Sequence, residues 1–129
     1  ITGQRVGTLL RLDPENSDVV EIDLGDGSAP HGVIVGPDGD AWVTDGGRNA
    51  VQRVDATTSE VTEFTVPLPG ANLNTAAFDG DGILWFTGQS GVYGRVDPAT
   101  GDIAAWESPR LLFQLSIRVN NIPMLLPAQ

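Results

Sequence analysis

The chain has 129 residues, of which 40% are hydrophobic, and carries a formal net charge of −10. This length and composition suit one ordinary domain with a sizeable core. The negative charge disfavours phosphate backbones and anionic lipid surfaces, so we expect neither a nucleic-acid nor a membrane partner. The sequence contains no cysteine, which excludes disulfides and thiolate metal sites and leaves the redox compartment open.

The first segment, residues 1–28, contains Arg11-Leu12-Asp13-Pro14 followed by a short β-rich run. Arg53-Val54-Asp55-Ala56 and Arg95-Val96-Asp97-Pro98 repeat this pattern, at a spacing of 42 residues both times. A fixed period of this size marks propeller and solenoid repeats. By this register, we expect residues 1–28 to hold only the outer half of a first repeat.

The second segment, residues 29–69, forms one complete repeat. The apolar run at 32–35 predicts a first strand, and a Gly-Pro-Asp-Gly turn leads to a second strand at 41–44. Residues 50–54 predict a third strand and 60–66 a fourth, which Pro67 ends. Four short antiparallel strands in a repeat of about 42 residues are typical of a β-propeller blade.

The third segment, residues 70–110, repeats the second, with Trp85 in the place of Trp42. We predict that both tryptophans pack in the core between neighbouring blades. Arg53 and Arg95 are expected to brace turns or neighbouring blades. The last segment, residues 111–129, lacks the turn, the tryptophan and the arginine pattern. A degenerate blade, a strand that completes the first blade and an atypical terminus all remain open for it.

The predicted fold class is therefore all-β, with propeller blades that form an incomplete ring within one chain. Propellers normally close with four to eight blades, and an open array leaves apolar faces and strand edges exposed. Two explanations stay open. Either further blades belong to a longer protein, or copies of this chain self-associate to close a ring.

Polar residues collect near the start of the inner strand and after the second strand, which share one face of a propeller. His31, the single histidine, suits general base catalysis or metal ligation there, although a loop histidine bonded to backbone is the simpler interpretation. Asp45 follows the second strand on the same face. We predict a substrate or ligand face made of Arg48, Asn49, Asn74, Gln89 and Ser90.

Four stretches of the second segment resemble one repeat of the streptogramin B lyase (virginiamycin B lyase) family. They are Ala29-Pro30-His31-Gly32-Val33, residues 36–45 with Trp42-Val43-Thr44-Asp45, Val51-Gln52-Arg53-Val54 and residues 63–69. The similarity covers residues 29–110 well and 5–28 in part. It implies a bacterial seven-bladed propeller, of which roughly half is present. The printed sequence opens without a signal-like segment, and both the cytoplasm and secretion remain open.

The same resemblance implies a chemistry. Members of this family linearise a cyclic depsipeptide antibiotic at its ester by elimination, using magnesium and a histidine general base, which is a form of antibiotic resistance. The resemblance assigns His31 as that catalytic base and Asp45 as a magnesium ligand. Ala29 and Asn74 stand where the family has an acidic residue and a further histidine.

Three functional hypotheses follow from these patterns. The first is a magnesium-dependent carbon–oxygen lyase that acts through His31. The second is a non-catalytic propeller module that binds a cyclic peptide, another small ligand, a protein or a glycan on its loop face. The third is a propeller segment whose role is to self-associate. Fold alone does not choose among them.

Overall fold

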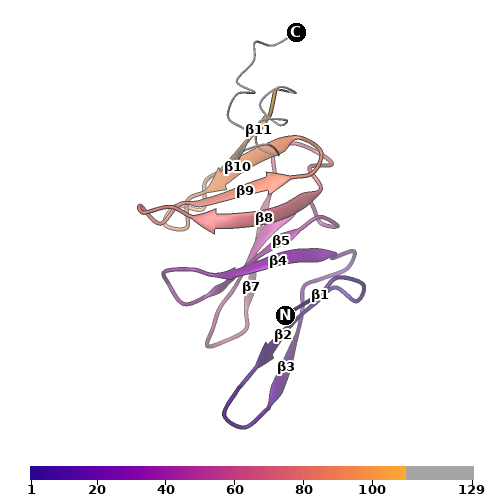
Figure 1. The fold of residues 1–129 in the computed structure, drawn as a ribbon, viewed down its shortest axis with the longest axis vertical. Helices are drawn as coiled ribbons and strands as arrows, with labels where there is room; N and C mark the ends of the chain where they lie inside the picture. Colours follow the sequence, from indigo (N-terminus) through magenta and orange to yellow (C-terminus); the bar gives the residue numbers. More distant parts are fainter. Residues whose placement is uncertain (110–129) are drawn as a thin grey trace, which may run out of the picture.

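The computed structural model describes residues 1–109, which contain strands and no helix. Three antiparallel sheets follow one another along the chain, from the indigo sheet at the N-terminus to the orange sheet (Figure 1). We name them blade 1, blade 2 and blade 3. The all-β prediction is confirmed, and the three sheets do not close a ring within the described residues. The segment 111–129, for which three interpretations were open, lies outside the described residues.

Blades 2 and 3 have four strands each, and blade 1 has three, in sequential order within each sheet. Blade 1 consists of β1 (Thr2–Gly3), β2 (Thr8–Leu12) and β3 (Val19–Asp23). Blade 2 consists of β4 (Pro30–Val35), β5 (Ala41–Asp45), β6 (Ala50–Val54) and β7 (Val61–Thr65). Blade 3 consists of β8 (Leu73–Phe78), β9 (Leu84–Gly88), β10 (Val92–Val96) and β11 (Ile103–Glu107).

The structure explains why the arginines repeat every 42 residues whereas the tryptophans lie 43 apart. The connector into blade 3, residues 66–72, is one residue longer than the connector into blade 2, residues 24–29. The loop that joins β9 to β10, residues 89–91, is one residue shorter than its counterpart at 46–49. Connector and loop touch in both blades through backbone hydrogen bonds, so the two changes compensate each other at one place.

The core lies between the blades. Trp42 is 1% exposed and packs between blades 2 and 3, where its ring stacks on Phe64 at 5.6 Å and meets the edge of Phe78 at 5.8 Å. A second cluster joins blades 1 and 2 through Leu9 and Ile22 on one side and Val43 on the other. Because each blade buries its face against the next, burial depends on a neighbour being present.

The prediction that Trp85 is a core residue is wrong for the described residues, since Trp85 is 40% exposed. It occupies the same place in blade 3 as Trp42 in blade 2, and its indole lies beside Arg95 at 6.0 Å as that of Trp42 lies beside Arg53 at 5.5 Å. The difference is the neighbour. Blade 3 covers Trp42, and no described sheet covers the equivalent face of blade 3.

The predicted bracing role is confirmed for Arg53. Its Nε donates to Asp40 at 2.7 Å, and a terminal nitrogen pairs with Asp38 at 3.1 Å, so both carboxylates of the turn before β5 are held. Arg11 acts between blades instead, where it donates to the Ala56 carbonyl at 2.7 Å. In blade 3, Ile83 replaces the equivalent of Asp40, and Arg95 contacts only Trp85 among these groups.

An apolar groove of about 330 Å³ separates parts of blades 1 and 2, lined among others by Leu9, Arg11 and Val35. These residues correspond to Val51, Arg53 and Phe78, which surround Trp42 at the next interface. The groove therefore lies where a large aromatic side chain fills the equivalent space between blades 2 and 3. No helix in the described part of the chain is long and apolar enough to cross a membrane.

Candidate functional site

His31 lies near the start of β4, the inner strand of blade 2, and its side chain is exposed. The pairing of β4 with β5 shifts register between Pro30 and Gly32, so His31 is the residue at an irregularity of the strand. Bulges of this kind redirect a side chain and often occur beside binding sites. The inner strand of blade 3 has a comparable shift between Leu73 and Ala76, a stretch that contains Asn74.

The His31 imidazole is oriented by the next blade. Its Nδ1 lies 3.0 Å from the backbone carbonyl oxygen of Asn74. A carbonyl oxygen accepts only, so Nδ1 carries the proton and donates it. In the neutral ring Nε2 then has the free lone pair, which is the atom that accepts a proton or ligates a metal. The structure thus brings His31 and Asn74 together, through the backbone of Asn74.

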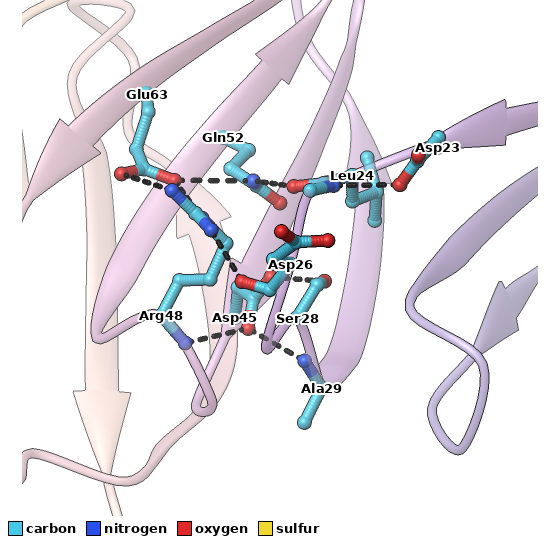
Figure 2. Close-up of polar contacts among 10 residues, drawn as sticks. Asp23, Leu24, Asp26, Ser28, Ala29, Asp45, Arg48, Gln52 and Glu63 are labelled. Carbon is cyan, nitrogen blue, oxygen red and sulfur yellow. Dashed lines mark hydrogen bonds and ion pairs between the residues drawn. The ribbon is translucent and has the colours of Figure 1, made fainter.

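Asp45, at the end of β5, is fully buried, and its carboxylate faces the connector that precedes His31. One oxygen accepts from the backbone N–H groups of Ala29, at 2.9 Å, and Arg48, at 3.0 Å. The other oxygen accepts from the Ser28 hydroxyl. With both oxygens occupied in this way, the carboxylate braces the connector, as Figure 2 shows.

Arg48 extends the same bracing (Figure 2). Its guanidinium pairs with Glu63 on β7 and donates to the Asp26 carbonyl in the connector. The Glu63 carboxylate raises the pKa of Arg48 above its ordinary value, chiefly through the hydrogen bond and then through its charge. Gly25 lies beside this guanidinium and has a φ of 100°, a backbone conformation that favours glycine. A side chain at this position would also contact the guanidinium.

Gln52 lies beside this ion pair and joins blade 2 to the connector that follows blade 1. Its Nε2 donates to the Leu24 carbonyl at 2.8 Å and to Glu63 at 3.3 Å. The side chain is 1% exposed, and within the described residues its Oε1 has no hydrogen-bond partner. Sequence reasoning missed this residue, because a glutamine in a strand carries no signal that it faces a neighbouring blade.

Asn49 performs the corresponding task at the connector into blade 3. Its Nδ2 donates to the Leu68 carbonyl at 2.8 Å, and its Oδ1 accepts from the Ala71 N–H at 3.0 Å. Arg48 and Asn49, two of the five residues predicted for the ligand face, therefore bond to connectors, and Arg48 also pairs with Glu63 on β7. Gln89 and Ser90 are exposed in the β9–β10 loop, where Gln89 accepts from Asn72 at 3.3 Å.

The described residues do not fit a magnesium site by themselves. They contain no group of three or more histidine, cysteine, aspartate and glutamate side chains that could hold a metal ion. Magnesium prefers oxygen ligands in a near-octahedral arrangement. The Asp45 carboxylate, which the family resemblance assigns as a ligand, is directed at the connector, whereas the His31 imidazole is directed at Asn74.

Thr44 is a further residue of this site that sequence reasoning did not single out. It is 2% exposed, and its hydroxyl accepts from the Gly32 N–H at 3.0 Å and donates to the Asn74 carbonyl at 2.8 Å. The available signal was the repeated threonine two residues after Trp42 and Trp85. The repetition shows that the position is equivalent in both blades and does not show what the hydroxyl contacts.

Comparison with solved structures places these blades among known folds. A catalytically inactive histidine-to-alanine variant of virginiamycin B lyase from Staphylococcus aureus, with quinupristin, matches with a TM-score of 0.76 and 28% identity. The match covers 84% of this chain and 37% of that chain. A streptogramin B lyase structure matches with a TM-score of 0.77 and 22% identity, over 84% of this chain and 36% of that one.

A protein from Lactobacillus plantarum matches with a TM-score of 0.57 and 18% identity, over 83% of this chain and 38% of that one, which supports the fold alone. No family model matches the sequence, and no curated protein matches it. The chain is therefore similar to the streptogramin B lyases in its propeller blades, over less than half of the length of those proteins.

Proposed function

We propose that this chain is a blade module of a streptogramin-lyase-like propeller and binds a cyclic peptide or another small ligand on the face that presents His31. The carrying observation is the exposed His31 side chain, placed at a strand irregularity with its Nδ1 bound to the next blade. Inner strands line the channel of a propeller, so the free Nε2 and the Asn74 side chain belong to one wall. The module supplies part of that wall.

In this proposal the wall is completed by further blades of the same kind, which copies of this chain supply by self-association. Trp85 and Trp106 are each 40% exposed on the open face of blade 3, where the equivalent residues of blade 2 pack against a neighbour. Blade 1 exposes Leu12 and Val19, and their counterparts Val54 and Val61 pack against blade 1 itself. The two ends of the array thus carry the two halves of a blade interface.

Self-association is tested by the solution mass of the full 129-residue chain, measured by light scattering at micromolar concentration. The expected result is an assembly several times the 13.6 kDa of one chain. A stable, folded monomer at that concentration contradicts self-association. It leaves the ligand proposal to the next experiment.

Ligand binding is tested on His31 directly, because one histidine gives one imidazole signal in an NMR spectrum. The probe is quinupristin, the compound in the similar virginiamycin B lyase structure. We expect its addition to shift the His31 signal in a saturable way, with the Asn74 amide shifting alongside. The control is the amide of Ser59, in the β6–β7 turn away from this face. Equal shifts at both places, or none, contradict the proposed face.

A second function, elimination at a carbon–oxygen bond, is favoured by the His31 tautomer. With Nδ1 donating to Asn74, Nε2 is the basic atom. In the proposed step Nε2 takes a proton from the carbon next to the one that bears the ester oxygen. The electrons of that C–H bond form a carbon–carbon double bond, and the carboxylate leaves with the electrons of the broken C–O bond. No water is consumed.

Magnesium is proposed for this reaction only by resemblance, and when bound it would supply charge stabilisation to the substrate. The activity test is quinupristin opening followed by mass spectrometry, with and without added magnesium. Elimination leaves the mass unchanged, whereas hydrolysis adds the mass of one water. We expect His31→Ala to abolish the opening, and retained activity in that variant removes His31 from the mechanism.

A further inference from the structure

The backbone around His31 has an unusual source of stability. β4 shifts register at His31, and directly after the shift the Gly32 N–H donates to the Thr44 hydroxyl on β5 at 3.0 Å. Thr44 thus closes the irregularity from the neighbouring strand. Its hydroxyl also donates to the Asn74 carbonyl at 2.8 Å, so one side chain ties two inner strands together.

The Asn74 carbonyl is the meeting point of this arrangement. It accepts from the Thr44 hydroxyl and from His31 Nδ1, which together use both of its lone pairs. Gly32 leaves room for this approach, since a Cβ there would lie 2.9 Å from the Asn74 oxygen and 3.1 Å from the Thr44 hydroxyl. The position of the imidazole therefore depends on a packed, fully bonded cluster.

The arrangement repeats in the preceding blade. Thr2 pairs with Leu9 as Thr44 pairs with Val51, so the two threonines hold equivalent places on β1 and β5. The Thr2 hydroxyl donates to the His31 carbonyl at 3.0 Å, as the Thr44 hydroxyl donates to that of Asn74. His31 is thus bonded to blade 1 through its backbone carbonyl and to blade 3 through its ring.

We propose that Thr44 is the positioning residue of His31. Its hydroxyl fixes the Asn74 carbonyl so that this oxygen keeps the His31 proton on Nδ1 and leaves Nε2 facing the channel. The proposal concerns the same face as the proposed function. Its test requires neither ligand binding nor turnover, so its failure can be distinguished from failure of the proposed function.

The test is ¹⁵N NMR of the His31 ring in the full chain, which reports the protonated nitrogen directly. In the unsubstituted chain at a pH where the ring is neutral, we expect the proton on Nδ1. A proton found on Nε2 overturns the proposal without any variant. Thr44→Val removes the hydroxyl at nearly constant shape, and we expect the Nδ1–H fraction to fall and ring-proton exchange to accelerate about three- to tenfold.

Two further variants distinguish positioning from a general loss of structure. Thr44→Ser keeps the hydroxyl and is expected to restore the His31 tautomer and exchange rate. Thr87→Val changes the equivalent threonine of blade 3, for which the structure shows no hydroxyl hydrogen bond among residues 1–109, and is expected to leave both unchanged. A Thr44→Val ring identical to that of the unsubstituted chain, or an equal effect of Thr87→Val, overturns the proposal.

Discussion

Asp45 acts through its burial. A buried carboxylate is stable only when its oxygens are satisfied, and here the donors come from Ser28, Ala29 and Arg48. The bonds hold the connector that leads into β4. They therefore fix the backbone position of Ala29, which lies one residue before Pro30 and two before His31.

We expect Asp45→Ala to lower the free energy of unfolding by about 2–4 kcal/mol, because it leaves several part-buried donors without an acceptor. Asp45→Asn keeps one carbonyl oxygen and should cost less. Urea unfolding measures both. The matched control is Asp81→Ala in an exposed turn, expected to change stability by less than about 0.5 kcal/mol. Equal effects of Asp45→Ala and Asp81→Ala contradict the bracing role.

Asp79 offers a prediction on pH. The Trp85 indole N–H donates to it at 2.8 Å, and this bond, followed by backbone N–H groups such as that of Ile83, lowers the pKa of Asp79. A lowered pKa means that the folded state favours the charged form. The resulting stabilisation is present above the ordinary aspartate pKa and is lost as the pH falls through the lowered value.

Trp85→Phe removes the largest of these contributions and should raise the pKa of Asp79 toward its usual range. Carboxyl ¹³C NMR across an acid titration measures it. Asp55 is the internal reference, because its pKa is lowered by the Thr58 and Thr57 backbone N–H groups and not by an indole. An unchanged Asp79 titration, or a parallel change at Asp55, contradicts the assignment of the cause.

At the scale of the element, each blade interface is one packing unit. Trp42 is covered by Phe64 of its own blade and Phe78 of the next, whereas Trp85 has the same sequence setting without the next blade. The two tryptophans therefore separate the contribution of a neighbouring blade from that of the residue itself.

Trp42→Ala is expected to lower the free energy of unfolding by about 3–5 kcal/mol, as for a large aromatic side chain removed from a packed core. Trp85→Ala should cost less than half as much under conditions where the chain is monomeric, because much of its indole is already exposed. Denaturant unfolding followed by circular dichroism measures both. Similar losses for the two variants argue against the interface as the packing unit.

The blade strands were largely predictable, and the site was predictable only in part. The Gly-Pro-Asp-Gly turn located β5 and side-chain alternation located β6, both within a residue of their observed bounds, because turn and strand patterns are local properties of the sequence. The role of Asp45 depends on Ser28 and Ala29, which come from a different element and reach it only in the folded state. A sequence pattern marks such a residue as polar and cannot say which way it faces.

At the scale of the whole molecule, the two ends of the array differ in chemistry. Blade 3 exposes Trp85 and Trp106, and blade 1 exposes the aliphatic residues Leu12 and Val19. Contact between such different surfaces is head-to-tail, which closes into a ring or grows into a filament. The propeller prediction anticipated exposed faces, and the structure shows which residues form them.

We expect Trp85→Ser combined with Trp106→Ser to convert any assembly of this chain into monomers that keep the three sheets, since neither side chain is needed for the described blade interfaces. Light scattering and circular dichroism measure the two properties. Val6→Ser, another exposed apolar position, is the control and should leave the mass unchanged. An assembly that survives the double substitution contradicts the role of the blade 3 face.

The compensating lengths of the connectors and of the loops beside them bear on how this repeat can be altered. The β4–β5 and β8–β9 turns, residues 36–40 and 79–83, have equal lengths, and only the opposite edge differs between blades 2 and 3. That edge is the one that carries the polar face. A graft there would succeed only as a matched pair, with the 66–72 connector and the 89–91 loop exchanged together for residues 24–29 and 46–49, whereas either piece alone would leave a gap or an overlap of one residue.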